Sequence, residues 1–156
     1  MKVLIVLAAV LGLAGCETQA TYAPAPTARA FGYSDAAIKD GRWRITFRAA
    51  AHADPGRVEN MALLRAAELT LKQGSDWFIV TDRFDETRDE AGVRSASHVG
   101  FGRRTAVGLR TGYGIDRTGG PMIARTLVIV IGRGPAPTAA NVYGAWAVRR
   151  TLGPHV

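Results

Sequence analysis

Apolar and polar residues alternate clearly in one early stretch of the chain. Trp43, Ile45 and Phe47 occupy every second position, and Arg42, Arg44, Thr46 and Arg48 occupy the positions between them. A period of two is typical of a strand with one face in the core and the other in solvent. We therefore predict a strand over Arg42–Arg48 whose wet face carries the three arginines.

A helical period follows this strand. Pro55 suits the opening of a helix, which we place at about 57–73, and Gly74 suits its end. Leu63, Leu64, Ala67 and Leu71 form its apolar stripe, and we expect Leu64 and Leu71 to face a sheet. Glu68 and Lys72 are four apart on its polar side, in the orientation that favours an ion pair.

The later part of the chain predicts further strands. Residues 77–80 are all apolar and indicate a strand buried on both faces that closes at Thr81–Arg83, and 122–131 indicate a central strand. Two weaker alternations predict strands at 93–101 and 105–113. Before them, Asp85 to Glu90 contains enough charge to indicate a loop.

Local signals predict helical structure at both ends of the domain. Ser34 can cap a short helical turn that runs to Lys39, and Asn141 can cap a final helix over about 142–152. In that final helix we expect Val142, Ala145 and Trp146 to face inward. The whole pattern predicts an α+β fold in the order β-α-β-(β-β)-β-α. It implies a small mixed sheet of about four to five strands, with one helix on a face and a C-terminal helix.

The first residues have the features of an export signal. Lys2 precedes an apolar run from Val3 to Leu13, which is shorter than the roughly 20 residues that a transmembrane helix needs. The sequence Leu13-Ala14-Gly15-Cys16 that ends this run resembles the lipobox of bacterial lipoproteins. That resemblance implies cleavage before Cys16 and acylation of its thiol. The alternatives are a plain secretory signal with a coincidental cysteine, or an N-terminal hydrophobic helix.

Cysteine content and the following residues extend this interpretation. Cys16 is the only cysteine, so the chain can form no internal disulfide and no cysteine-based metal site. We predict a signal peptide at 1–15, a flexible Thr-, Ala- and Pro-rich tether at 16–30, and one domain at 31–156. Glu17 stands where many lipoproteins retained in the inner membrane have Asp. The resemblance therefore favours the outer membrane, with the domain in the periplasm.

Three phrases extend the resemblance to a family. They are Gly32-Tyr33-Ser34-Asp35, Gly74-Ser75-Asp76-Trp77-Phe78, and the run from Leu63 to Leu71. Together with the lipobox they resemble a family of small Gram-negative lipoproteins of unknown function. This resemblance implies an envelope location and a compact domain, and it brings no active site.

The charge of the chain bears on its partners. The formal net charge is +7. Such an excess fits an anionic partner, for example phospholipid, cell wall or an envelope protein, whereas export argues against nucleic acid. We single out Arg42, Arg44 and Arg48 as candidate contacts with an anionic surface. The alternative is that they simply keep the strand solvated.

Motifs that would indicate chemistry are missing. The sequence contains no Gly-x-Ser-x-Gly, no Gly-Lys-Ser/Thr phosphate loop and no His-Glu-x-x-His. We therefore predict no catalytic residues, no cofactor-binding residues and no metal ligands, and name Cys16 alone as a lipid-attachment site.

Weaker candidates are better explained structurally. Ser97 and His98 beside Ser95 could suggest half a triad, but neighbouring residues of a strand point to opposite faces. Gly100 and Gly102 before Arg103-Arg104 could form an anion-binding turn. The scattered histidines are His52, His98 and His155. An acidic cluster without calcium-loop spacing is formed by Asp82, Asp85, Glu86, Asp89 and Glu90. Glu68 and Asp76 are a pair of carboxylates near the end of the helix.

The sequence thus favours a lipid-anchored envelope protein that binds or scaffolds a partner and is not an enzyme. The alternative is a small envelope hydrolase that acts on cell-wall or lipid substrates. A pocket with a perturbed carboxylate or histidine would favour the alternative.

Overall fold

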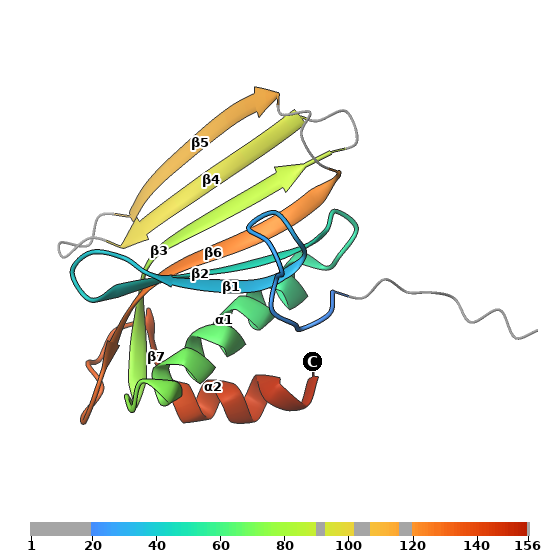
Figure 1. Cartoon of the computed structure of the whole chain (residues 1–156). Coiled ribbons are helices and arrows are strands. Elements are labelled where there is room, and N and C mark those ends of the chain that lie inside the picture. Colours follow the sequence, from blue (N-terminus) through green and yellow to red (C-terminus); the bar gives the residue numbers. More distant parts are fainter. Residues whose placement is uncertain (1–19, 90–92, 102–106, 116–119, 156) are drawn as a thin grey trace, which may run out of the picture.

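A seven-stranded antiparallel sheet carries two helices on one face (Figure 1). The computed structural model describes residues 20–89, 93–101, 107–115 and 120–155. Along the chain lie β1 (Gly32–Ala37), β2 (Arg42–Ala50), α1 (Pro55–Lys72), β3 (Trp77–Arg88), β4 (Val93–Phe101), β5 (Val107–Ile115), β6 (Met122–Gly132), β7 (Val142–Gly144), α2 (Ala145–Leu152) and a short 3-10 helix, η1 (Gly153–His155). The predicted α+β class is confirmed. The sheet has more strands than predicted, and all its strand pairings are antiparallel.

The strand order is β1-β2-β6-β3-β4-β5, and β7 pairs with the start of β3. β6 is the central strand that the apolar run at 122–131 predicts. It lies between β2 and β3, which therefore run parallel to each other without being neighbours. The pair Ile45 and Leu127 is buried where β2 meets β6.

α1 covers the apolar face of β2 and β6. Its N-cap is Asp54, whose carboxylate accepts a 2.8 Å hydrogen bond from the Arg57 backbone N–H, and Pro55 occupies the first turn. Gly74, with φ +68°, follows the helix end as predicted. Leu63 and Leu71 pack against the core. Leu64 is 1% exposed and lines a cavity beside α2, so it faces the second helix rather than the sheet.

β3 is longer than predicted. The segment expected to be a charged loop continues the strand to Arg88, after a bulge between Val80 and Asp82. The charges remain in the strand because both neighbours neutralise them. Arg125 of β6 forms an ion pair with Asp85, and Arg94 of β4 lies 3.4 Å from Glu86.

The C-terminal helix starts later than predicted. Val142–Gly144 form β7, and the Asn141 side chain donates to the Val80 carbonyl at 2.9 Å instead of capping a helix. α2 therefore begins at Ala145, which is buried as expected. This shift turns Trp146 outward, and its side chain is 62% exposed, so its predicted inward position is wrong.

The segment before β1 lies against the domain. Tyr22 packs against Tyr33 and Phe47, with ring centroids 4.9 and 6.3 Å apart, and its hydroxyl donates to Glu68 at 2.6 Å. The first packed residues therefore precede Phe31, where we expected the domain to begin. The predicted helical turn at Ser34 is wrong, because β1 occupies that stretch.

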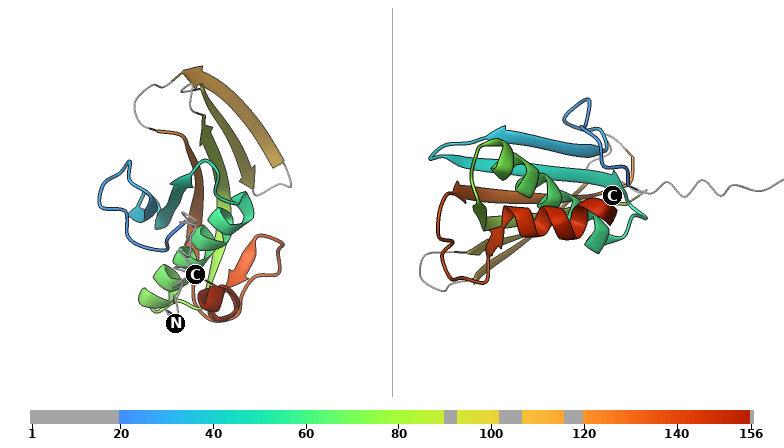
Figure 2. Two further views of the ribbon diagram at one scale, coloured as in Figure 1. Left: turned by 90° about the vertical axis from the view of Figure 1, so that its right-hand side faces the viewer. Right: turned by 90° about the horizontal axis from the view of Figure 1, so that it is seen from below.

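The helices cover only part of the sheet. Figure 1 shows α1 and α2 below β1, β2 and β6, whereas β4 and β5 extend beyond them. The side views in Figure 2 show both helices on the same side of the sheet. The opposite surface, which no helix of the described residues covers, is called the open face below.

Candidate functional site

The open face carries the wet side of β2. In the register between β2 and β6, Arg44, Thr46 and Arg48 lie opposite Val128, Thr126 and Ala124. These β2 residues point away from the core residues Ile45 and Phe47. Arg42, Arg44 and Arg48 therefore share one face, as the alternation predicts. Thr46 is buried between them and bonds Thr126, with the two hydroxyl oxygens 2.9 Å apart.

The three arginines differ in their partners. The Arg42 guanidinium lies 3.6 Å from Asp40, in an exposed pair. Arg44 is exposed and Arg48 is half-buried, and neither side chain forms a hydrogen bond or ion pair within the part of the chain that the structure describes. Both guanidinium groups are therefore available to an external anion.

A second cluster lies on the same face, over β3 and β4. The Phe84 and His98 rings stack with centroids 4.3 Å apart, and His98 Nε2 lies 2.9 Å from Asp82 Oδ1. Phe84 is 39% exposed. One row of paired residues crosses the sheet from β2, which carries the arginines, to the aromatic pair: Thr46, Thr126, Phe84 and His98.

The charge on the open face is unevenly distributed. Over β3 and β4, Glu86 pairs with Arg94, and the Arg88 Nε donates to the Gly120 carbonyl at 3.1 Å. Over β2, Arg42 is the one arginine that has a carboxylate partner among the described residues. Uncompensated positive charge therefore gathers at Arg44 and Arg48.

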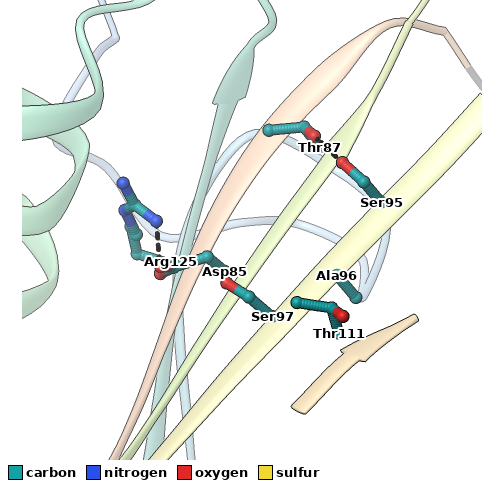
Figure 3. A pocket seen from close by; sticks show the side chains of 7 residues that line it. All are labelled: Asp85, Thr87, Ser95, Ala96, Ser97, Thr111 and Arg125. Carbon is teal, nitrogen blue, oxygen red and sulfur yellow. Dashed lines mark hydrogen bonds and ion pairs between the residues drawn. The ribbon is translucent and has the colours of Figure 1, made fainter. Parts of the chain in front are cut away.

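A polar groove lies on the helix side of the sheet, where β3, β4 and β5 extend beyond α1. It has a volume of about 290 Å³ and is lined by Asp85, Thr87, Ser95, Ala96, Ser97, Thr111 and Arg125 (Figure 3). The Thr87 and Ser95 hydroxyl oxygens lie 2.6 Å apart, and Arg125 pairs with Asp85. The Arg125 Nε is buried without a hydrogen-bond partner among the described residues. The sequence did not predict this groove, although polar residues that alternate along one strand, such as Ser95 and Ser97, could have indicated it.

The weaker candidates do not come together. Ser97 lines the groove and His98 lies on the open face, as strand alternation requires, so they form no catalytic pair. His52 lies in the loop after β2, and His155 lies in η1 beside Asp54 and Arg57. The acidic residues of β3 alternate between the two faces. Within the described ranges, no three histidine, cysteine or acidic side chains converge as a metal site.

Glu68 and Asp76 have partners other than those that the sequence predicts. Instead of Lys72, Glu68 contacts Tyr22 and Arg65, whose guanidinium also bonds Asp35 at 2.7 Å. Asp76 accepts from the Gly134 backbone N–H at 2.8 Å, which is a structural role. Asp89 accepts from the Val93 backbone N–H at 2.8 Å, closing the turn between β3 and β4. Cys16, Glu90, Gly102, Arg103 and Arg104 lie outside the described residues.

Comparisons of this chain with protein families, curated proteins and solved structures gave no match.

Proposed function

We propose that this chain is a lipid-anchored protein of the bacterial cell envelope, with acyl chains on Cys16 and its domain in the periplasm. Support comes from the signal-like run that ends in Leu13-Ala14-Gly15-Cys16. The three family-like phrases agree with it, and Glu17 favours the outer membrane. No helix among the described residues is long and apolar enough to cross a bilayer. Intact-mass analysis of the membrane fraction tests the anchor, and an unlipidated Cys16 would contradict it.

We further propose that the domain is a binding module whose open face receives an anionic partner in the periplasm. The observation that carries this proposal is the pair Arg44 and Arg48. The other strand arginines whose side chains the structure describes have partners: Arg42, Arg83, Arg88, Arg94 and Arg125. Two guanidinium groups without a carboxylate partner on one face favour a ligand with carboxylate or phosphate groups.

The geometry favours the cell wall over the chain's own membrane as that partner. Tyr22 lies beside Glu68 of α1, so the chain enters the domain on the helix side of the sheet. The arginines project from the opposite side. An anionic polymer in the periplasm is therefore better placed to reach them than the bilayer that holds Cys16.

Binding to purified cell wall across a salt series tests this role. The chain without residues 1–16 is sedimented with cell wall, as wild type and with Arg42, Arg44 and Arg48 all changed to Gln. At about 1 kcal/mol for each basic residue, the triple variant should bind roughly 100-fold more weakly at low salt. Added salt should remove most of the difference, because the Debye length is about 8 Å at physiological ionic strength.

The matched control removes the same charge elsewhere. Lys72, Arg149 and Arg150 are exposed residues of the two helices, off the open face, and changing all three to Gln should leave most of the binding intact. Equal losses of binding in the two triple variants would mean that binding depends on net charge alone and not on the open face. No binding at low salt would contradict the proposed partner.

A small hydrolase is the second candidate, and the Asp82–His98 pair favours it. A carboxylate that holds a histidine ring is one part of many acid–base sites. Thr126 is the nearest threonine in the same row, but it lies two strands from His98, roughly 10 Å at the usual strand spacing. The pair would therefore have to activate water.

Incubating the protein with purified cell wall or lipid, and measuring released fragments, tests this second candidate. A hydrolase should release products, and His98→Gln should abolish the release. His155→Gln, in η1, provides the control. The absence of products from the wild-type protein would contradict the hydrolase and leave binding as the one proposed role.

A further inference from the structure

α2 presents one exposed stripe to the outside of the molecule. Trp146, Arg149 and Arg150 are all exposed, and their spacing of three and four residues places them on one side of the helix. The Arg149 guanidinium lies 5.4 Å from the centre of the Trp146 indole. These three residues are called the α2 stripe. Trp146 is 62% exposed, the largest fraction among the exposed large hydrophobic side chains that the structure describes.

The α2 stripe ends where the chain enters the domain. A cavity of about 500 Å³ between them is lined by Tyr22, Leu64, Glu68, Arg149, Arg150, Gly153 and Pro154. Tyr22 is fixed there by its bond to Glu68 and by its ring contacts. The entry point and both arginines thus belong to one side of the molecule.

Covalent reach limits how far this side can lie from an anchored Cys16. Tyr22 is the sixth residue after Cys16, and six residues span at most about 20 Å when fully extended. α2 is 8 residues long, about 12 Å. The entry point at Tyr22 therefore stays within about 20 Å of a surface to which Cys16 is attached, and the α2 stripe stays close to it.

The charge and chemistry of the stripe suit an anionic lipid surface. α2 contains two arginines and no acidic residue. The nearby Glu68 carboxylate is already held by Tyr22 and Arg65. Indole rings favour the headgroup region of a bilayer, and arginine side chains can lie along it with their charge in the phosphate layer.

We propose that the α2 stripe docks on the anionic phospholipid surface in which the acyl chains of Cys16 are embedded. This inference rests on the proposed lipid anchor. It gives the domain a fixed orientation, with the helices against the membrane and the open face directed into the periplasm. Arg44 and Arg48 are then presented away from the bilayer.

The test uses the full lipidated protein reconstituted in vesicles that contain brominated acyl chains, which quench nearby indoles. The chain has three tryptophans, so the difference between wild type and Trp146→Phe isolates the Trp146 signal. We expect Trp146 to be quenched in vesicles with anionic lipid, and far less in purely zwitterionic vesicles. Arg149→Gln with Arg150→Gln should shift the equilibrium between docked and undocked domain by roughly 30-fold.

The matched control is Arg44→Gln with Arg48→Gln, which removes equal charge from the open face and should leave the quenching unchanged. Intact mass of the same sample reports acylation of Cys16 separately. Acylated protein whose Trp146 is not quenched would overturn docking and leave the anchor standing, whereas an unacylated Cys16 would overturn both.

Discussion

Tyr22 packs the segment before β1 against the core. Its ring lies against Tyr33 and Phe47, and its hydroxyl donates to the Glu68 carboxylate. Burial, and then the hydrogen bond and charge of Glu68, raise the pKa of Tyr22 above its ordinary value of 10.0. The folded state therefore favours the neutral phenol.

Changing Tyr22 to Phe keeps the ring contacts and removes the hydroxyl. We expect a loss of about 1 to 2 kcal/mol in the free energy of unfolding at neutral pH, measured by chemical denaturation. Because the pKa is higher in the folded state, the wild type should also lose stability as pH rises above about 10. Tyr22→Phe should lose less over that range. Parallel stability curves between pH 9 and 11.5 would contradict this assignment.

Gly132 shows a residue-scale constraint inside the sheet. It lies opposite Trp77, and a Cβ there would overlap the indole. Gly132→Ala should therefore destabilise the protein by about 1 to 3 kcal/mol, seen as a lower melting temperature. Gly112→Ala in β5 is the control, because a Cβ there meets no atom within 4 Å. Equal effects of the two substitutions would mean that the indole moves aside.

At the scale of elements, α1 is buried both toward the sheet and toward α2. Val58, Met61 and Ala62 belong to the core against the sheet, while Leu64 is buried beside the cavity that α2 residues also line. Leu64→Ala should cost about 2 to 5 kcal/mol in the free energy of unfolding. Lys72→Ala, at the exposed end of the same helix, should cost less than about 0.5 kcal/mol. Similar melting shifts for the two variants would show that Leu64 is not part of a packed interface.

Elements with a regular apolar period could be predicted from the sequence, and those fixed by distant partners could not. β2 was predictable because it buries one face at a constant spacing, and α1 because its apolar residues recur at helical spacing. The second half of β3 was not, because Asp85 and Glu86 remain in a strand only beside Arg125 and Arg94. In the same way, Asn141 looks like a helix cap but bonds Val80, which is distant in sequence.

The candidate site was predictable only in part, for the same reason. Alternation alone placed Arg42, Arg44 and Arg48 on one face. The stacking of Phe84 on His98, and the polar groove, depend on which strands are neighbours. The exposure of Trp146 depends on where α2 begins, which β7 pairing decides.

At the scale of the whole molecule, the sheet has a covered half and an uncovered half. α1 packs over β2 and β6, whereas β4 and β5 extend beyond the helices (Figure 1). Local stability follows the density of buried apolar contacts. Amide hydrogens of β2 and β6 should therefore exchange slowest, and those of β4 and β5 many times faster, in native-state exchange followed by mass spectrometry. Uniform protection over the sheet would contradict this division.

The segment before β1 also changes what an edge of this sheet can do. The backbone N–H of Tyr33 donates to the Ala23 carbonyl and its carbonyl accepts from the Ala25 N–H, both at 2.8 Å, so these edge groups are already paired. Gly32, at φ +112°, lets Ala23 approach closely, and Pro24 has no N–H to offer another strand. A chain cut at Phe31 would expose hydrogen-bonding groups that invite a strand from another molecule. Ala23, Pro24 and Ala25 thus block the addition of a strand from another molecule at this part of the edge.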